Sequence, residues 1–345
     1  RLTFARERRS RPPTPATALD LDGRSLRVVQ TTTRGGQPVV SRIAVAPLNL
    51  PADAERTDPA PLGAAMAKAL EQLKLKPGPV VLGIPRAQVV LKTLMLPVIA
   101  EVSELASVVH LQVAKDLPFR LAEAVVDFRI HRQIDPPDPK PGTGGKPGAP
   151  AEAAPAAAKL EVLVAVARRD VVQFYQRAVE LAGLKIVALG LLPSASLRCV
   201  EACRVTDPAH AFALVSLRHD EVSIDIVADQ AAPFSRGTVV KAPLDTPATT
   251  AADAPPVKGA APRSEPSAAS GVMGAQAFVN AATIEIVRSL HSYSGLGVAA
   301  PVTKVLVAGA TGHEAAVIAA LSARTSVPVL LLDTSSLELA STLPP

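Results

Sequence analysis

The chain contains two cysteines and six histidines, the residue types most often used for metal and redox chemistry. Cys199 and Cys203 lie four residues apart in a predicted helix. This spacing stacks two side chains on one face but does not suit a disulfide. Because no third cysteine completes a metal site, we interpret both as small buried apolar residues in a reducing compartment. The histidines, among them His110, His291 and His313, show no metal-ligand spacing and no triad partner, so we predict no metal site.

Basic side chains are concentrated at the start of the sequence. Arginines occupy five of the first eleven positions, and they account for much of the net charge of +5. Such a cluster can contact anionic lipid or nucleic acid. Instead of such a contact, we favour a solvated, flexible basic tail at residues 1–15, and we expect no nucleic-acid partner. Because the sequence begins at Arg1 and not at Met, the existence of an upstream segment is left open.

The most informative stretch of the sequence runs from Pro79 to Ile130. It begins with apolar, β-branched runs bounded by proline and glycine, which predict strands, and continues with an amphipathic pattern of helical spacing. Pro118 ends that helix, and alternating residues then predict a half-buried strand. The predicted order is strand, strand, helix and strand, over residues 80–84, 89–96, 101–116 and 124–134.

The rest of the sequence alternates between predicted strands and helices, which indicates an α/β fold. Two segments, 135–158 and roughly 243–270, are rich in proline, alanine, glycine and threonine and lack aliphatic periodicity. They cannot bury enough apolar surface to offset chain entropy, so we interpret both as disordered insertions. The further predicted helices cover residues 62–73, 168–182, 194–203 and 275–293.

The order of these features resembles the PilM family, the actin-like proteins of type IV pilus assembly. The similarity lies in the strand ending at Leu96-Pro97, the acidic helix, the Leu117-Pro118-Phe119 motif and the strand VVDFRI. Three later segments agree with it: LVAVARRDVVQFYQRAVELAGLKIVAL, EIVRSLHSY and KVLVAGATG. The resemblance covers most of the chain outside the two insertions and the first fifteen or so residues.

The resemblance implies an actin-like, two-lobed fold of the FtsA and PilM type, with an inserted small subdomain and the two disordered insertions. It predicts a first lobe from residues 16–96 and 188–207, and an inserted subdomain from residues 97–187. The second lobe would comprise residues 208–242 and 299–345, with residues 243–298 as an insertion in it.

Actin-like proteins hold ATP with Mg²⁺ between their lobes, and the resemblance implies where the phosphates would lie. The first phosphate turn has the family pattern D-x-G-S-x-S-x-K, which Asp20 and Ser25 match and in which Arg27 replaces lysine. Asp22, however, stands where a glycine belongs, and a carboxylate there repels a triphosphate by roughly 1 kcal/mol or more per charge pair. Asp20 is alternatively a polar residue that closes a β-hairpin.

The other two nucleotide motifs are also altered. In the second phosphate turn, Ser216 and Arg218 occupy the positions of the family's aspartate and glycine, and Arg218 could pair with Asp22 or with a phosphate. In the adenosine-facing turn Gly309 and Gly312 remain, although a plain strand-to-helix turn explains them equally well. We therefore predict weak or absent nucleotide binding, no catalytic residue and no hydrolysis. We favour the absence of any cofactor, with ATP and Mg²⁺ as the alternative.

PilM proteins bind the N-terminal cytoplasmic peptide of PilN, a single-pass membrane protein, and link the assembly platform to its motor. The resemblance implies a groove for such a peptide near Leu96, Pro97, Pro118 and Phe119, although Leu96 and Phe119 are more often plain core residues. We expect a scaffold, peripheral on the cytoplasmic face of the inner membrane through its partner. No signal peptide precedes Ala18, and no apolar stretch reaches the roughly 18 to 20 residues that span a bilayer.

Two alternatives stay open at this point. One is an ATPase of the same fold that acts as a nucleotide switch. The other is the cytoplasmic part of a type II secretion protein of the GspL type, which shares the fold and continues into a membrane helix.

Overall fold

The computed structural model describes residues 16–34, 37–50, 57–135, 157–203, 205, 210–228, 231–243, 274–296 and 300–334. The chain divides into two compact units. Of the described residues, those up to Leu19 and Val28–Leu191 form unit 1, while Asp20–Arg27 and those from Leu192 onward form unit 2. The predicted basic tail and most of both predicted insertions lie outside the described residues.

A five-stranded sheet of order β3-β2-β1-β4-β8 includes the first strands of the chain. Its strands are β1 (Thr17–Asp22), β2 (Ser25–Arg34), β3 (Gln37–Pro47), β4 (Val80–Ile84) and β8 (Ile186–Leu191). Strand β4 pairs in parallel with both β1 and β8. A central parallel strand is buried by its neighbours, and Val80, Leu82 and Ile84 accordingly lie in the core.

Two helices of unit 1, α1 (Ala60–Gln72) and α3 (Arg169–Leu181), pack against each other. Their close approach depends on Gly63, where a Cβ atom would lie 2.7 Å from the Cβ atom of Leu181 and 2.9 Å from the carbonyl oxygen of Ala178. Helix α3 buries Tyr175, Ala178 and Val179. We expected this helix within the inserted subdomain of residues 97–187, and its packing against α1 corrects that placement.

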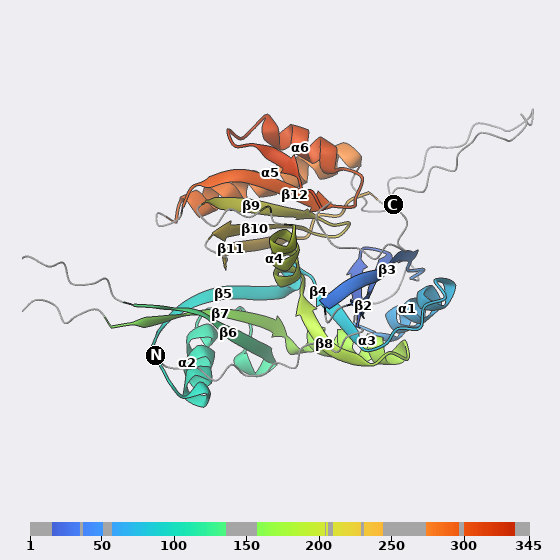
Figure 1. Ribbon diagram of the computed structural model, residues 1–345, viewed down its shortest axis with the longest axis horizontal. Coiled ribbons are helices and arrows are strands. Elements are labelled where there is room, and N and C mark those ends of the chain that lie inside the picture. The colour runs from blue at the N-terminus through green and yellow to red at the C-terminus, as the bar shows by residue number, and fades with distance from the viewer. Residues whose placement is uncertain are drawn as a thin grey trace, which may run out of the picture. The chain divides into compact units, whose positions relative to one another are not determined.

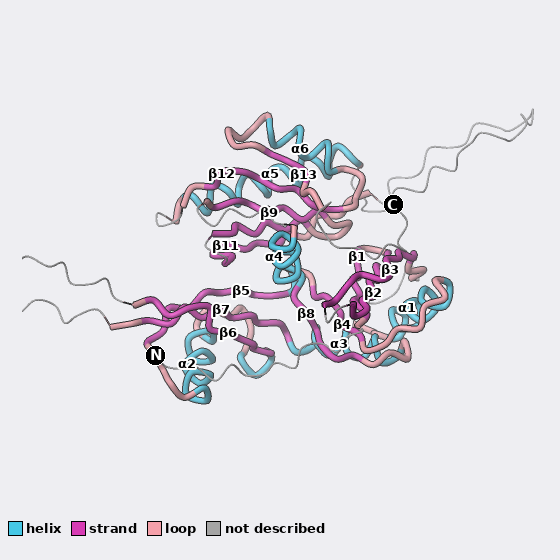
Figure 2. The backbone as a smooth tube through the Cα atoms, in the orientation of Figure 1, coloured by secondary structure: helices cyan, strands magenta, loops and turns pink. Residues whose placement is uncertain are grey.

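A separate three-stranded antiparallel sheet of order β5-β7-β6 lies in unit 1 (Figures 1 and 2). Its strands are β5 (Val89–Pro97), β6 (Ala124–Ile134) and β7 (Lys159–Arg168), and short 3₁₀ turns η1 (Arg86–Gln88) and η2 (Leu121–Glu123) precede β5 and β6. Helix α2 (Val102–Ala114) buries Leu105, Val109 and Val113 in the core of this sheet. We expected β5 in the first lobe, but it pairs along its whole length with β7, from Val89 opposite Ala167 to Pro97 opposite Lys159.

Unit 2 contains a five-stranded sheet of order β11-β10-β9-β12-β13. The strands are β9 (Ala211–Leu217), β10 (Val222–Ala228), β11 (Ala231–Thr238), β12 (Val302–Gly309) and β13 (Val329–Leu331). Strands β9, β12 and β13 are parallel, whereas β10 and β11 form antiparallel pairs. Alternate residues of β9 point to opposite faces, and both faces are buried because helices cover both.

Helices α5 (Ala275–Ser294) and α6 (Glu314–Ser322) cover one face of this sheet (Figure 1). Phe278 of α5 is fully buried between them and the strands. We expected α5 within an insertion of the second lobe over residues 243–298, and its burial shows that this helix contributes to the core of unit 2. The opposite face is covered by α4 (Leu192–Ala202), whose Leu197 and Val200 pack against Phe212 and Leu214. We had placed α4 in the first lobe, and these contacts assign it to unit 2.

Candidate functional site

The predicted nucleotide residues gather at one end of the unit 2 sheet. Strands β9 and β12 are parallel and end side by side, with Leu217 opposite Gly309. Arg218 follows β9 directly, and the turn of residues 309–312 follows β12. Ligands of α/β proteins bind at the carboxyl ends of parallel strands, so this end of the sheet is where a ligand is expected. The hairpin turn of residues 20–27 belongs to the same unit.

Arg218 binds the hairpin turn in a bidentate ion pair. Its two terminal nitrogens donate hydrogen bonds of 2.9 Å each to the two carboxylate oxygens of Asp20, and one also donates to the carbonyl oxygen of Leu21 at 2.5 Å. The side chain is only 9% exposed. Burial opposes the charge of the guanidinium, but Asp20, Asp22 and Asp220 outweigh that effect and raise the pKa of Arg218 above its ordinary value. Arg218 therefore keeps its charge inside the protein.

Asp22, which stands where the family has a phosphate-binding glycine, has no exposed surface. Its carboxylate forms an ion pair with Arg27 at 2.5 Å and accepts a hydrogen bond of 2.7 Å from the backbone N–H of His219. Oδ2 of Asp22, the oxygen that contacts Arg27, also lies 3.2 Å from Nδ1 of His219. These contacts satisfy a buried charge that would otherwise be strongly unfavourable. We call Asp20, Asp22, Arg27, Arg218 and His219 the phosphate-turn cluster.

The glycine that follows Asp22 is fitted to this cluster. Gly23 has a φ of +60°, a left-handed conformation that residues with a Cβ atom rarely adopt. A Cβ atom at Gly23 would lie 2.8 Å from the Cβ atom of His219. The space next to the turn is therefore filled by a protein side chain.

Asp220 adds a third carboxylate beside Arg218. Its Oδ1 lies 4.0 Å from Nε of Arg218, which is beyond hydrogen-bond distance, and Asp22 Oδ1 lies 3.9 Å from the same nitrogen. Burial of Asp220 raises the pKa of its carboxyl group, with Asp22 adding to the effect and Arg218 opposing it. The charges of Arg27 and Arg218 thus face three carboxylates.

The turn of residues 309–312, which the resemblance predicts to face adenosine, is closed by an acidic side chain. Glu314 Oε1 accepts hydrogen bonds from the backbone N–H of Thr311 at 2.6 Å and from its hydroxyl at 2.8 Å. A Cβ atom at Gly309 would lie 2.6 Å from this same oxygen, and Gly312 has a φ of +80°. Burial opposes ionisation of Glu314, but the hydrogen bonds from Thr311 and Gly312 hold the pKa below its ordinary value.

The structure brings most of the predicted residues together but with different partners. We expected Arg218 to pair with Asp22 or a phosphate, and its bidentate partner is Asp20. Ser25 begins β2 and is half-buried. The contacts of His219 and Glu314 were not predicted. Nothing in the sequence marks His219, whereas the Thr311-x-x-Glu314 spacing is typical of a capping box and could have indicated Glu314.

This arrangement does not fit a triphosphate bound in the usual way. A phosphate turn needs free N–H groups and uncompensated positive charge, but here the N–H of His219 and both guanidinium groups already bind carboxylates. Two like unit charges 4 Å apart repel by about 4 kcal/mol at an effective dielectric constant of about 20. Among the described residues there is also no group of three or more side chains arranged to bind a metal ion.

The residues predicted for a peptide groove divide into core and surface. Leu96 is 4% exposed and belongs to the core of the three-stranded sheet, against which Phe119 packs. The guanidinium carbon of Arg168 also lies 5.9 Å from the centre of the Phe119 ring. Pro97 and Pro118 are exposed. The two prolines are therefore exposed enough to contact a partner directly. Leu96 is a core residue, which was the alternative that the sequence suggested for it.

A groove of about 450 Å³ lies close by in unit 1, which we call the β6 groove. It is beside β6, an edge strand of its sheet. Val126 packs toward the core of this sheet, and Arg169 donates a hydrogen bond of 2.9 Å to the carbonyl oxygen of Ala124. The residues that line the groove are His110, Leu121, Ala122, Ala124, Val125, Val126 and Arg169.

Cys199 lies on α4 and Cys203 directly follows this helix. The described residues contain no group of three or more metal-ligand side chains to which these thiols could belong. Cys203 is buried and Cys199 is half-buried. Burial and the neighbouring Cys203 raise the pKa of Cys199 to about 11. A thiol with such a pKa stays protonated near neutral pH, so it is a poor nucleophile.

Comparison with known proteins bears on these features. Residues 18–141 match the family model described as type IV pilus assembly protein PilM. Across these residues the chain is similar to the PilM family. The predicted resemblance is therefore confirmed over the part of the sequence that includes the first phosphate turn and the Leu117-Pro118-Phe119 motif. No curated protein sequence matches this chain.

Solved structures extend the similarity to nearly the whole chain. A PilM–PilN type IV pilus biogenesis complex matches 95% of this chain and 91% of its own, with a TM-score of 0.69 and 16% identity. A Bacteroides thetaiotaomicron protein of actin-like ATPase fold and unknown function matches 92% of this chain and 90% of its own, with 8% identity and a TM-score of 0.47. The ethanolamine utilization protein EutJ from Carboxydothermus hydrogenoformans matches 93% of this chain and 86% of its own, with 12% identity and a TM-score of 0.43. The likeness to the PilM–PilN complex confirms the predicted actin-like fold for this chain.

None of the helices that the structure describes is both long and apolar enough to cross a bilayer.

Proposed function

We propose that this PilM-like chain is a scaffold of a type IV pilus or related assembly platform and does not use ATP. The observation that carries the proposal is the bidentate pair between Arg218 and Asp20, because it joins the two turns that would hold phosphates in an ATP-binding relative. With these turns bound to each other, partner binding is the function left to the fold. The partner would hold the chain at the cytoplasmic face of the inner membrane.

The proposed partner is the N-terminal cytoplasmic peptide of a PilN-like membrane protein. The solved structure with the TM-score of 0.69 is a PilM–PilN complex, which supports a partner of this kind. We place the peptide in the β6 groove. Edge strands bind extended peptides through their free backbone groups, with nearby pockets for alternate side chains. Val125 does not belong to the core of the sheet and lines the groove, so its side chain is available to a partner.

The peptide proposal is tested by titrating the labelled N-terminal peptide of a PilN-like protein from the same organism into the full chain. We expect saturable binding that Val125→Asp weakens by about tenfold or more, because a carboxylate in an apolar contact is costly. Val239→Asp is the matched control, since Val239 is 62% exposed and belongs to unit 2. Unchanged binding by the Val125 variant would place the peptide elsewhere, and no binding at all would refute this partner.

The absence of ATP use is tested separately by calorimetric titration of Mg²⁺ and ATP into the same protein. We expect no saturable heat. Metal-dependent, saturable ATP binding would instead favour the nucleotide switch. Because the two titrations use different ligands, either part of the proposal can fail while the other stands.

A further inference from the structure

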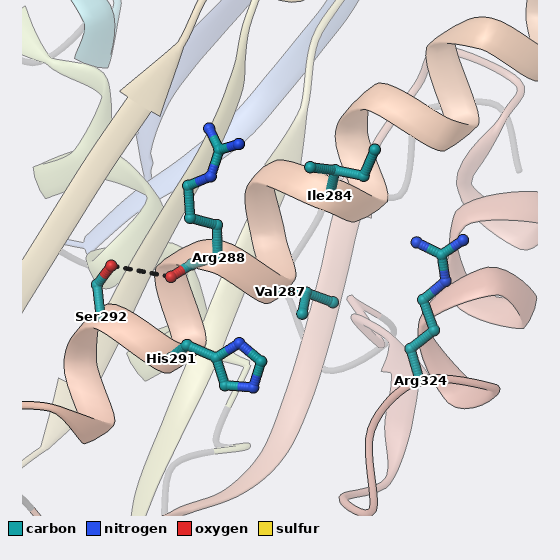
Figure 3. Close-up of a pocket in the computed structure, with 6 residues that line it drawn as sticks. All are labelled: Ile284, Val287, Arg288, His291, Ser292 and Arg324. Carbon is teal, nitrogen blue, oxygen red and sulfur yellow. Dashed lines mark hydrogen bonds between the residues drawn. The ribbon is translucent and has the colours of Figure 1, made fainter.

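Unit 2 has a second surface feature that shares no residue with the phosphate-turn cluster. It is a groove of about 550 Å³ between α5 and the segment that follows α6 (Figure 3). The groove is formed by one face of α5, and Arg324 stands on its other side. We call it the α5 groove; its lining residues are Ile284, Val287, Arg288, His291, Ser292 and Arg324.

The α5 groove is basic. None of its six lining residues carries a carboxylate. Arg288 forms an ion pair of 2.7 Å with Glu285, but Glu285 also lies 3.6 Å from Arg236, so one carboxylate serves two guanidinium groups. Arg324 is exposed and forms no ion pair within the described part of the chain. The groove therefore keeps uncompensated positive charge.

The same groove has an apolar floor. Ile284 and Val287 lie three residues apart on α5, a spacing that places them on one face, and Ile284 is 47% exposed. Arg288 is 58% exposed. Pockets for small molecules enclose most of their ligand, whereas these side chains remain open to solvent. A segment of another protein fits such a surface better than a small ligand does.

We infer that the α5 groove is a docking site for an acidic segment of a partner protein, in which carboxylates flank an aliphatic side chain. The aliphatic group would cover Ile284 and Val287, and the carboxylates would meet Arg288 and Arg324. Complementary charge directs the approach of a partner and suppresses wrong ones. This inference goes beyond the proposed function, because it concerns a different surface in a different unit from the β6 groove.

The probe is a short fluorescent peptide in which glutamates flank two leucines, titrated into the full chain and followed by anisotropy. We expect saturable binding that weakens as NaCl is raised, because salt screens exposed charges. The double variant Arg288→Glu, Arg324→Glu should bind about tenfold or more weakly, and Ile284→Ser should also lose affinity. Arg198→Glu is the control, because Arg198 is 69% exposed on α4 and lies outside the groove.

A charge-reversed peptide, with lysines in place of the glutamates, separates a specific site from general attraction to a basic protein. It should bind the natural chain weakly and gain affinity for the double variant. Equal binding of the two peptides would overturn the inference. So would an equal loss in the Arg198 variant, or unchanged binding by a folded double variant, as judged by circular dichroism.

Discussion

The four charged residues of the phosphate-turn cluster, Asp20, Asp22, Arg27 and Arg218, form ion pairs with one another. Arg218 binds Asp20, Arg27 binds Asp22, and the backbone of His219 donates to Asp22. Burial makes such a cluster sensitive to loss of one member, since the remaining charge is left without a partner. We also expect the turns to be poor receptors for phosphate, because its negative charge would compete with Asp20 and Asp22 for the same cations.

The first prediction concerns the energetic coupling of Arg218 and Asp20. Arg218→Ala and Asp20→Ala should each lower the free energy of unfolding by about 3 kcal/mol, because each deprives a buried or half-buried charge of its bidentate partner. The double variant should lose less than the sum of the two by about 1 to 3 kcal/mol. Urea denaturation of the four proteins measures this coupling.

The matched control for this cycle is the Arg198–Glu201 pair, whose side chains are 69% and 30% exposed. Exposed pairs contribute about 1 kcal/mol or less. Additive effects of Arg218→Ala and Asp20→Ala, with no coupling above that of the control, would show that the bidentate pair does not hold the two turns together.

The second prediction concerns Glu314 and pH. Its pKa is lowered in the folded protein, so its charge stabilises the fold at pH values above the ordinary glutamate pKa. That stabilisation is lost as the pH falls through the lowered pKa. Glu314→Gln keeps an oxygen that can accept from Thr311 but removes the charge. We expect the variant to lose less stability than the natural chain between neutral and acidic pH, measured as urea midpoints. Parallel pH curves for both proteins would contradict this role of Glu314.

At the scale of the helices and strands, α5 is central to unit 2. Its Phe278 is fully buried, packs in the core of the sheet and lies 5.5 Å from the ring of His313. We predict that Phe278→Ala lowers the free energy of unfolding by about 3 to 5 kcal/mol, the usual cost of the cavity that such a change leaves. Gln276→Ala, at an exposed position of the same helix, should change it by about 0.5 kcal/mol or less. A small effect at Phe278 would show that α5 contributes little to the core of unit 2.

The sequence predicts these elements well because their patterns are local. The β-branched run of residues 80–84 and the helical spacing of residues 101–116 determine type and approximate length, and β4 and α2 are found there. The neighbours of an element depend on distant residues. Alternation along β5 shows that it is a strand but not that β7 is its partner, and the pattern of α5 does not reveal which sheet it covers. Each wrong placement in the predicted domains is of this kind.

The same distinction holds for the candidate site. Replacement of glycine by Asp22 and Arg218 in the two phosphate turns is visible in the sequence and predicts poor phosphate binding. Which carboxylate Arg218 would bind depends on side-chain geometry that spans 198 residues of sequence, and only the structure identifies Asp20. His219 contributes a backbone N–H, a group that every residue except proline has, so its identity carries no signal.

At the scale of the whole molecule, the chain has two tyrosines and no tryptophan, and its two units contain one tyrosine each. Tyr175 is buried in α3 of unit 1, and Tyr293 is buried in α5 of unit 2. Tyrosine fluorescence of the Tyr293→Phe and Tyr175→Phe variants therefore reports the unfolding of unit 1 and unit 2, respectively. Ligand stabilisation can in this way be assigned to a unit.

The last prediction uses these reporters to locate the proposed partner peptide. A ligand that binds only the folded state stabilises it by about 2.7 kcal/mol at a free concentration of 100 times its dissociation constant. Since the β6 groove lies in unit 1, a saturating PilN-like peptide should raise the urea midpoint reported by Tyr175 more than the midpoint reported by Tyr293. A scrambled peptide and Mg²⁺ with ATP should raise neither. A larger shift at Tyr293 would place the peptide on unit 2, and a shift caused by ATP would show that the phosphate-turn cluster opens to admit a nucleotide.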